Sequence, residues 1–216
     1  MADTVFFPNE FERIGGHPSL DFVNTVDHWF KPRPKNYLPH YESLVTWHLQ
    51  TGLLAPSSAA ALRLEATAAP GEAQEAHARA MALRQALYHM FTAFHGNGPD
   101  SEAVGCFNRV LTQSMPFRFL RPCGERYRWV VEDVAGNLDR LLWPLLWETA
   151  QLLTSDRLSR VKQCPGPEGC GWLFLDASKN RSRRWCSMKT CGNVAKAKRH
   201  YRKQKKRPGS NRERTT

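Results

Sequence analysis

Four cysteines in the last quarter of the chain have the residue type and spacing that most clearly indicate chemistry. Two close pairs, with five and four intervening residues, are separated by a stretch of fifteen. Zn²⁺ binds four thiolates at tetrahedral corners about 2.3 Å away, and two close pairs supply them with only one large loop to close. An all-cysteine set leaves no open coordination position, which favours a structural over a catalytic ion. The predicted ligands of this single zinc ion are Cys164, Cys170, Cys186 and Cys191.

The alternative interpretation of the four cysteines is a set of unrelated thiols or a disulfide. The N-terminus lacks the basic start and long apolar stretch of a secretory signal, and no run of 18 apolar residues is present. We therefore expect a cytoplasmic protein that does not enter a membrane, in which clustered cysteines are metal ligands more often than disulfides. Cys106 and Cys123 lie outside the cluster and are interpreted as core thiols.

Positive charge is concentrated around these cysteines. Residues 160–216 contain 17 Lys and Arg against 3 Asp and Glu, whereas residues 1–159 contain 14 against 17. Such a field attracts polyanions, and small hydroxyl and amide side chains between the cysteine pairs are typical of phosphate contacts. The sequence therefore predicts nucleic acid, in the first place duplex DNA, as a partner. The predicted DNA contacts are Arg181, Arg183, Arg184, Lys189, Lys196, Arg199 and Lys203.

The elements that must position the cysteines are a hairpin and a helix. Residues 158–163 and 172–175 are expected to form its two strands, and a basic helix is expected to begin near Cys191, which makes the module treble-clef-like. Val194, Ala197 and Tyr201 share one helical face, which is expected to pack on the zinc core and turn the cations toward a nucleic-acid groove. A solvated surface helix is the alternative. The neighbouring aromatic residues are better explained as core than as stacking platforms for bases.

The first 155 residues read as a mainly helical (α+β) body. Helices are expected from Pro18, from Pro56, over 71–95, over 100–115 and over 137–153, where Pro144 must kink or split the last one. Residues 117–121 and 127–131 are expected to form a small β-hairpin. We predict three parts: a helical body over 1–155, a zinc finger over 160–206 and a disordered basic tail over 207–216.

An enzyme is a further class to weigh, and its best candidate group is His17, Asp21 and Asn24. These residues fall close together around the first predicted helix, but helix capping or buried hydrogen bonding explains them better. No nucleophile–base pair or phosphate loop accompanies them, so a non-enzymatic protein is predicted. The same three residues remain candidates for lining a small-ligand pocket.

Two parts of the sequence are similar to known families. The finger resembles the CGNR zinc-finger family through Phe174-Leu175-Asp176, Ser178, Asn180, Arg184-Trp185-Cys186-Ser187-Met188 and Cys191-Gly192-Asn193. The stretch Leu20-Asp21-Phe22-Val23-Asn24-Thr25 resembles the opening of the ABATE domain. The resemblance implies a stress-induced bacterial transcription regulator, with a DNA-binding finger and a sensing or regulatory N-terminal domain. Val194 stands where the finger family has arginine, so that contact is either lost or supplied by Lys189 or Lys196.

The preferred prediction is therefore a DNA-binding transcription regulator whose body senses a small-molecule effector or mediates dimerisation. A homodimer through the body is expected, because operators are commonly read by symmetric dimers. An RNA- or ribosome-binding protein is the alternative, since a cationic zinc finger can serve either nucleic acid.

Overall fold

Helix α4, Pro70–Ala93, is the element around which the helical body is built. Alanine and leucine recur along it at helical spacing, and Ala76, Ala80, Leu83 and Leu87 are all buried. Small side chains on this face allow neighbouring helices to approach closely. In the computed structural model, which describes residues 11–93, 98, 100–132, 134–166 and 169–205, α4 packs against α1, α2, α3 and α5.

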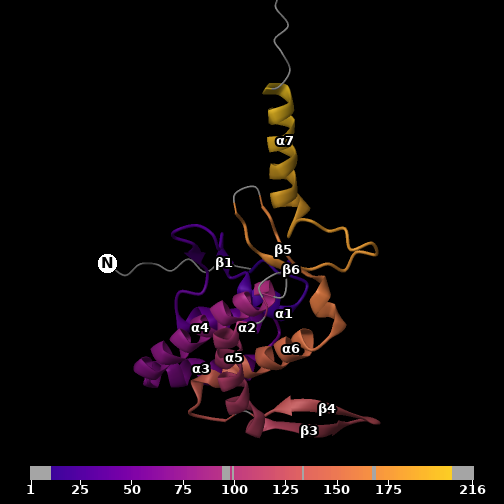
Figure 1. The fold of residues 1–216 in the computed structure, drawn as a ribbon. Coiled ribbons are helices and arrows are strands. Elements are labelled where there is room, and N and C mark those ends of the chain that lie inside the picture. The colour runs from indigo at the N-terminus through magenta and orange to yellow at the C-terminus, as the bar shows by residue number, and fades with distance from the viewer. Residues whose placement is uncertain (1–10, 94–97, 99, 133, 167–168, 206–216) are drawn as a thin grey trace, which may run out of the picture.

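The other helical elements of the body surround α4 or cover its ends (Figure 1). Proline occupies the first turn of α1, α3 and α6, where its missing N–H would have no helical partner. The elements are α1 Pro18–Val23, α2 Tyr41–Gln50, α3 Pro56–Ala68, α5 Ser101–Ser114, η1 Met115–Phe117, η2 Leu138–Leu142, α6 Trp143–Leu153 and η3 Asp156–Arg160.

Two features of the body refine the sequence prediction. Helix α2 had not been predicted, although Leu44, Val45 and Trp47 bury one of its faces. Pro144 splits the predicted last helix, because the chain runs as a 3-10 helix to Leu142 and starts an α-helix at Trp143. The predicted tail over 207–216 and the end of the helix predicted over 71–95 lie outside the described residues.

Three separate antiparallel strand pairs complete the described fold. Strands β1, Val26–Asp27, and β2, Lys35–Asn36, flank the proline-rich basic loop. Strands β3, Arg118–Cys123, and β4, Arg126–Val131, form a hairpin that projects from the body (Figure 1). Strands β5, Val161–Gln163, and β6, Leu173–Leu175, form the hairpin of the finger. The predicted class, mainly helical with small strand pairs and a four-cysteine module, is confirmed.

The main hydrophobic core continues from the body into the finger hairpin. Val161, Leu173 and Leu175 belong to the same buried cluster as Leu20 and Phe22 of α1. A second, smaller cluster gathers three of the cysteines around a buried phenylalanine. No helix in the described ranges combines the length and apolar character needed to cross a bilayer.

Candidate metal centre and nucleic-acid interface

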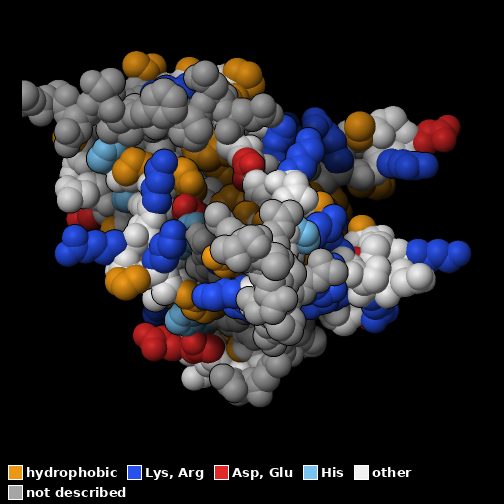
Figure 2. Space-filling view, turned by 90° about the horizontal axis from the view of Figure 1, so that it is seen from above, with side chains coloured by type: hydrophobic (Ala, Val, Ile, Leu, Met, Phe, Trp, Pro, Cys, Tyr) orange, Lys and Arg blue, Asp and Glu red, His pale blue; other side chains and the backbone are white. Residues whose placement is uncertain are grey.

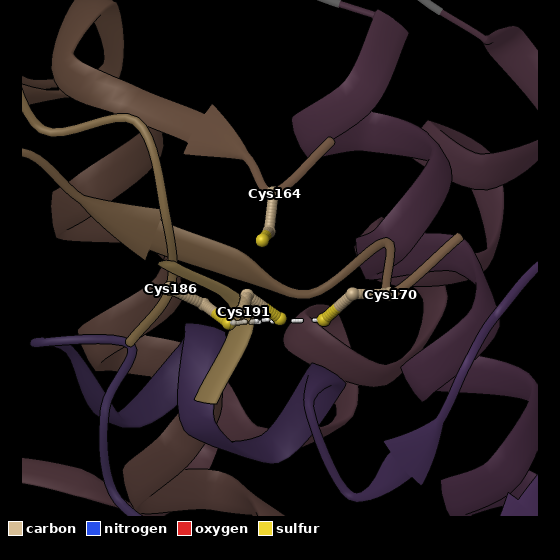
Figure 3. A group of neighbouring side chains, drawn as sticks. All are labelled: Cys164, Cys170, Cys186 and Cys191. Atoms are coloured by element: carbon tan, nitrogen blue, oxygen red, sulfur yellow. Dashed lines mark hydrogen bonds between the residues drawn. The ribbon is translucent and has the colours of Figure 1, made fainter. Parts of the chain in front are cut away.

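The four predicted zinc ligands converge on one point. Their sulfur atoms all lie within 4.8 Å of one another and point toward a common centre (Figure 3). The Sγ atoms of Cys170 and Cys186 are 3.7 Å apart, as are those of Cys186 and Cys191. A tetrahedron with Zn–S bonds of about 2.3 Å has S–S edges of about 3.8 Å. The donor set and its spacing therefore fit one zinc ion with no position left for a substrate.

Local structure explains how the ligands are held. Cys164 follows β5 and Cys170 precedes β6, while Cys191 lies in η4, the single π-helical turn Met188–Gly192. A side chain at Gly166 would collide with the Cβ of Cys170, so only glycine allows the tight knuckle between the first two ligands.

The electrostatics of the cluster also call for a cation. Burial, followed by the charge of the neighbouring Cys164 thiolate, raises the pKa of the Cys191 thiol. Crowded, buried thiols cannot all ionise without a counter-charge, because each thiolate repels the next. A divalent ion reverses this tendency, since the bound ligands must be deprotonated.

Arg183, one of the predicted DNA contacts, is engaged within the protein. Its guanidinium donates hydrogen bonds to four backbone carbonyls and lies over the Phe174 ring, with its Cζ atom 4.4 Å from the ring centroid. Little donor capacity is left for a base or a phosphate, so these contacts favour a structural role for Arg183 over a DNA contact. The acceptors are the carbonyl oxygens of Ile14, Leu175, Trp185 and Cys186.

Asp176 organises the loop that carries the other cations. Its buried carboxylate accepts hydrogen bonds from Ser178, from the backbone N–H of Arg183 and from Lys162 Nζ, which lies 2.6 Å from Oδ2. Burial alone would raise the pKa of Asp176, but the hydrogen bonds from Lys162 and Ser178 outweigh it and hold the pKa well below its ordinary value. The Asp176 carboxylate therefore fixes the conformation of the loop between the two cysteine pairs.

The remaining predicted contacts are exposed on two neighbouring surfaces. An open groove of about 830 Å³ beside the cysteines is lined in part by Arg184, Lys189 and the serines 178, 182 and 187. Helix α7, Asn193–Lys205, carries Lys196, Arg199 and Lys203 and projects from the molecule (Figure 1). Seen from this end, Lys and Arg are far more frequent than Asp and Glu (Figure 2).

The apolar face of α7 does not pack on the zinc core as the sequence analysis expected. Val194 is 41% exposed and Tyr201 67% exposed, and none of the residues of α7 is buried. The reason is geometric: α7 projects away from the body (Figure 1), and Trp172 and Trp185 pack against the cysteine cluster, whereas Val194 only borders a cavity beside it.

The three candidate ligand-binding residues make hydrogen bonds inside the protein. His17 Nδ1 accepts from the Ser19 N–H at the start of α1, and Asp21 Oδ1 accepts from the Gly15 N–H at 2.7 Å. Asn24 pairs with β6 in both directions: its Nδ2 donates to the Leu173 carbonyl and its Oδ1 accepts from the Leu173 N–H, both at 2.8 Å. These contacts match the capping and buried hydrogen-bonding interpretation.

Burial shifts the pKa values of the first two of these residues in opposite directions. Burial, with a smaller effect from Arg157, lowers the pKa of His17 to about 4. Burial raises the pKa of Asp21 to about 6, against the hydrogen bond from Gly15 and the charge of Arg13.

The body also contains a cavity that His17, Asp21 and Asn24 do not line. An open cavity of about 770 Å³ lies between α2, α3 and α4, and His40, Arg63 and His77 are among its lining residues. Its volume is within the range of small-molecule sites. The lining residues are spread over three helices, so no local sequence pattern could have grouped them.

A helical body built on a central helix, joined through a shared core to a four-cysteine finger, defines a zinc-finger protein with an additional helical domain. Residues 16–156 match the ABATE family, whose description is "Putative stress-induced transcription regulator", and residues 160–204 match the CGNR zinc finger. The chain belongs to the ABATE family, and its finger holds one structural zinc ion. Comparison with curated proteins finds no match.

Proposed function

We propose that this protein is a DNA-binding transcription regulator in which the zinc finger binds duplex DNA and the helical body regulates that binding. The observation that carries the proposal is the exposed cationic surface formed by α7 and the groove beside the zinc site. Helix α7 contains six Lys and Arg and no acidic residue. Zinc fixes the turn from which the helix projects, so the metal orients the surface that a polyanion contacts.

The change in charge along the chain supports different functions for the finger and the helical body. The body carries no comparable excess of cations, and its cavity between α2, α3 and α4 is a candidate site for a small-molecule effector. An effector that bound there would raise the melting temperature of the full-length protein in a thermal-shift screen of metabolites. A shift that His77→Ala abolished would locate the site.

The test of DNA binding is a competition among duplex DNA, single-stranded DNA and RNA on the zinc-loaded full chain. Each phosphate contact contributes about one unit to the slope of log affinity against log salt. We expect Arg184→Gln, Lys189→Gln, Lys196→Gln and Lys203→Gln together to weaken duplex binding strongly and to reduce this slope by about four units.

A matched control removes charge at the opposite end of the molecule. Arg121, Arg126 and Arg128 are exposed on the β3–β4 hairpin, and their replacement by Gln should leave both affinity and slope unchanged. Equal losses in both variants would indicate non-specific attraction and contradict the proposal. Preference for RNA over duplex DNA would assign the finger to RNA.

A further inference from the structure

Helix α7 carries its arginines and lysines at different positions around the helix axis. The helix joins the rest of the molecule at η4 and leaves all its residues at least partly exposed. A 13-residue helix without a packed face is marginal by itself in water, and its like charges repel one another. Such a helix gains stability when a polyanion covers its cations.

The two kinds of cation occupy different positions around the helix axis. With successive residues rotated by about 100°, Arg199 and Arg202 fall near the centre of the cationic arc, together with the small Ala195. Lysines occupy both edges, in two rows roughly 160° apart. One row is Lys196 and Lys203, and the other is Lys198 and Lys205.

The first turn of the helix lies nearest the rest of the protein, and Ala195 is half-buried there. Val194 lines a cavity of about 300 Å³ between the finger and the β1–β2 region, which also includes Asp27, His28 and Tyr37. The cationic arc lies largely on the other sides of the helix and is accessible to a large partner. No acidic residue interrupts it.

This order of residues matches the demands of the major groove of DNA. The groove is about 12 Å wide, so a helix inside it presents the middle of one face to base edges and its two flanks to the two phosphate strands. Arginine binds O6 and N7 of guanine with two parallel hydrogen bonds, whereas lysine acts as a flexible point charge that suits phosphate. Arginines at the centre and lysines on both flanks are the arrangement expected of a base-reading helix.

We propose that Arg199 and Arg202 read guanines in the major groove, while the two lysine rows hold the opposite phosphate strands. The inference rests on the proposed DNA binding and assigns base reading to the helix. Residues three apart are separated by about 4.5 Å along the helix, and base pairs by about 3.4 Å. The two guanines should therefore lie one or two base pairs apart.

The test is selection of binding sites from a random duplex pool with the zinc-loaded full chain. Arg199→Lys and Arg202→Lys keep the charge but remove the paired hydrogen bonds. We expect each to abolish guanine preference at one position, by roughly 5- to 150-fold in relative affinity, with an unchanged salt slope. Lys196→Gln and Lys198→Gln should instead lower the slope by about one unit each and leave the selected sequence unchanged.

The competing outcome is that Arg184, in the loop between the cysteine pairs, reads the bases, and Arg184→Lys tests it. Loss of preference in that variant, with preference retained in both helix variants, would overturn the inference but not DNA binding. A wild-type protein that binds duplexes without any sequence preference would also overturn the inference alone. Absence of duplex binding would overturn the proposed function itself. Zinc content and helicity measured for every variant separate these outcomes from misfolding.

Discussion

Neighbouring arginines in the finger have different surroundings, because only Arg183 is held by several hydrogen bonds to the backbone. The Arg183 guanidinium binds carbonyls from three segments of the chain, whereas Arg184 lies exposed beside Trp185 with its Cζ atom 5.7 Å from the ring centroid. Sequence proximity to the zinc ligands could not distinguish them. The distinction depends on the loop conformation that Asp176 imposes and on contact with the distant residue Ile14.

This contrast predicts different effects of the same substitution at adjacent positions. Arg183→Gln should lower the free energy of unfolding by on the order of 2 kcal/mol, because several carbonyls lose a charged donor. Arg184→Gln, the matched control, should leave stability within about 0.5 kcal/mol of wild type. Urea denaturation at constant zinc concentration measures both. Equal stabilities would mean that the guanidinium contacts in the loop have no energetic role.

The cysteines allow a similarly matched experiment. Replacement of any one zinc ligand by Ser should abolish stoichiometric zinc binding, because metal binding contributes on the order of 10 kcal/mol to the folding of zinc-finger peptides. Cys106→Ser and Cys123→Ser, which lie outside the cluster, should each retain one zinc per chain. A chromogenic chelator after protein denaturation measures the zinc content. Retention of zinc in Cys191→Ser would show that the fourth ligand is dispensable.

His48 predicts a pH dependence of stability. Burial, only partly offset by the hydrogen bond to Leu44, lowers its pKa to about 4 in the folded chain from an ordinary value of 6.5. Between these values the unfolded chain gains a proton that the folded chain excludes, so stability is lost as pH falls from about 6.5 to 4. The loss is on the order of 3 kcal/mol.

Replacing this histidine should flatten the dependence. His48→Leu should reduce the slope of unfolding free energy against pH in that window. His17, whose pKa is also lowered to about 4, keeps part of the slope, whereas Asp21, whose pKa is raised to about 6, opposes it. His200→Asn on the exposed helix α7 is the control and should leave the slope unchanged. An unaltered slope in His48→Leu would place the acid sensitivity elsewhere.

At the scale of elements, α1 connects the body to the finger. Its buried Leu20 and Phe22 share a core with β6, while Asn24 pairs with the backbone of Leu173 as another strand would. Further hydrogen bonds join Leu175 N–H to the Gly15 carbonyl and Trp172 Nε1 to the Val26 carbonyl. The residues that resemble the start of the ABATE domain therefore also hold the finger hairpin in place.

Breaking the Asn24 pairing should be costly. Asn24→Leu leaves both backbone groups of Leu173 buried without a partner, and we expect a loss of about 2–4 kcal/mol in unfolding free energy. Asn193→Leu, which removes one exposed hydrogen bond to the Lys189 carbonyl, supplies a control of the same chemistry. Comparable losses in the two variants would argue against a special role for the α1–β6 contact.

Sequence patterns predicted elements well where the signal lies within a short stretch of the chain. The long helix α4 and the hairpin β3–β4 follow from spacing and turn residues that are local in the chain. The position of α7 did not follow, because an apolar stripe indicates a packing face but not the element that fills it. Val194, Ala197 and Tyr201 share one face of the helix, but all three are exposed.

At the scale of the whole molecule, the two surfaces of the finger belong to different environments. The hairpin side contributes Leu158, Val161, Leu173 and Leu175 to the core of the body. The other side carries the zinc ligands and ends in the projecting helix α7 (Figure 1). The two matched families meet between residues 156 and 160, yet the packing of the protein continues across that point.

This continuity predicts where the protein should be cut when the metal is removed. Chelation should release the segment after β6, because its order depends on Cys186 and Cys191, whereas β5 and β6 remain packed on α1. Limited proteolysis of the chelated protein should therefore yield a stable fragment that ends after Leu175, identified by intact mass. A fragment that ends near 155–159 would instead support a finger that unfolds as a separate domain. Asn24→Leu distinguishes the two outcomes further: weakening the α1–β6 contact should shift cleavage from beyond Leu175 toward the 155–159 boundary, because the hairpin then depends on zinc alone.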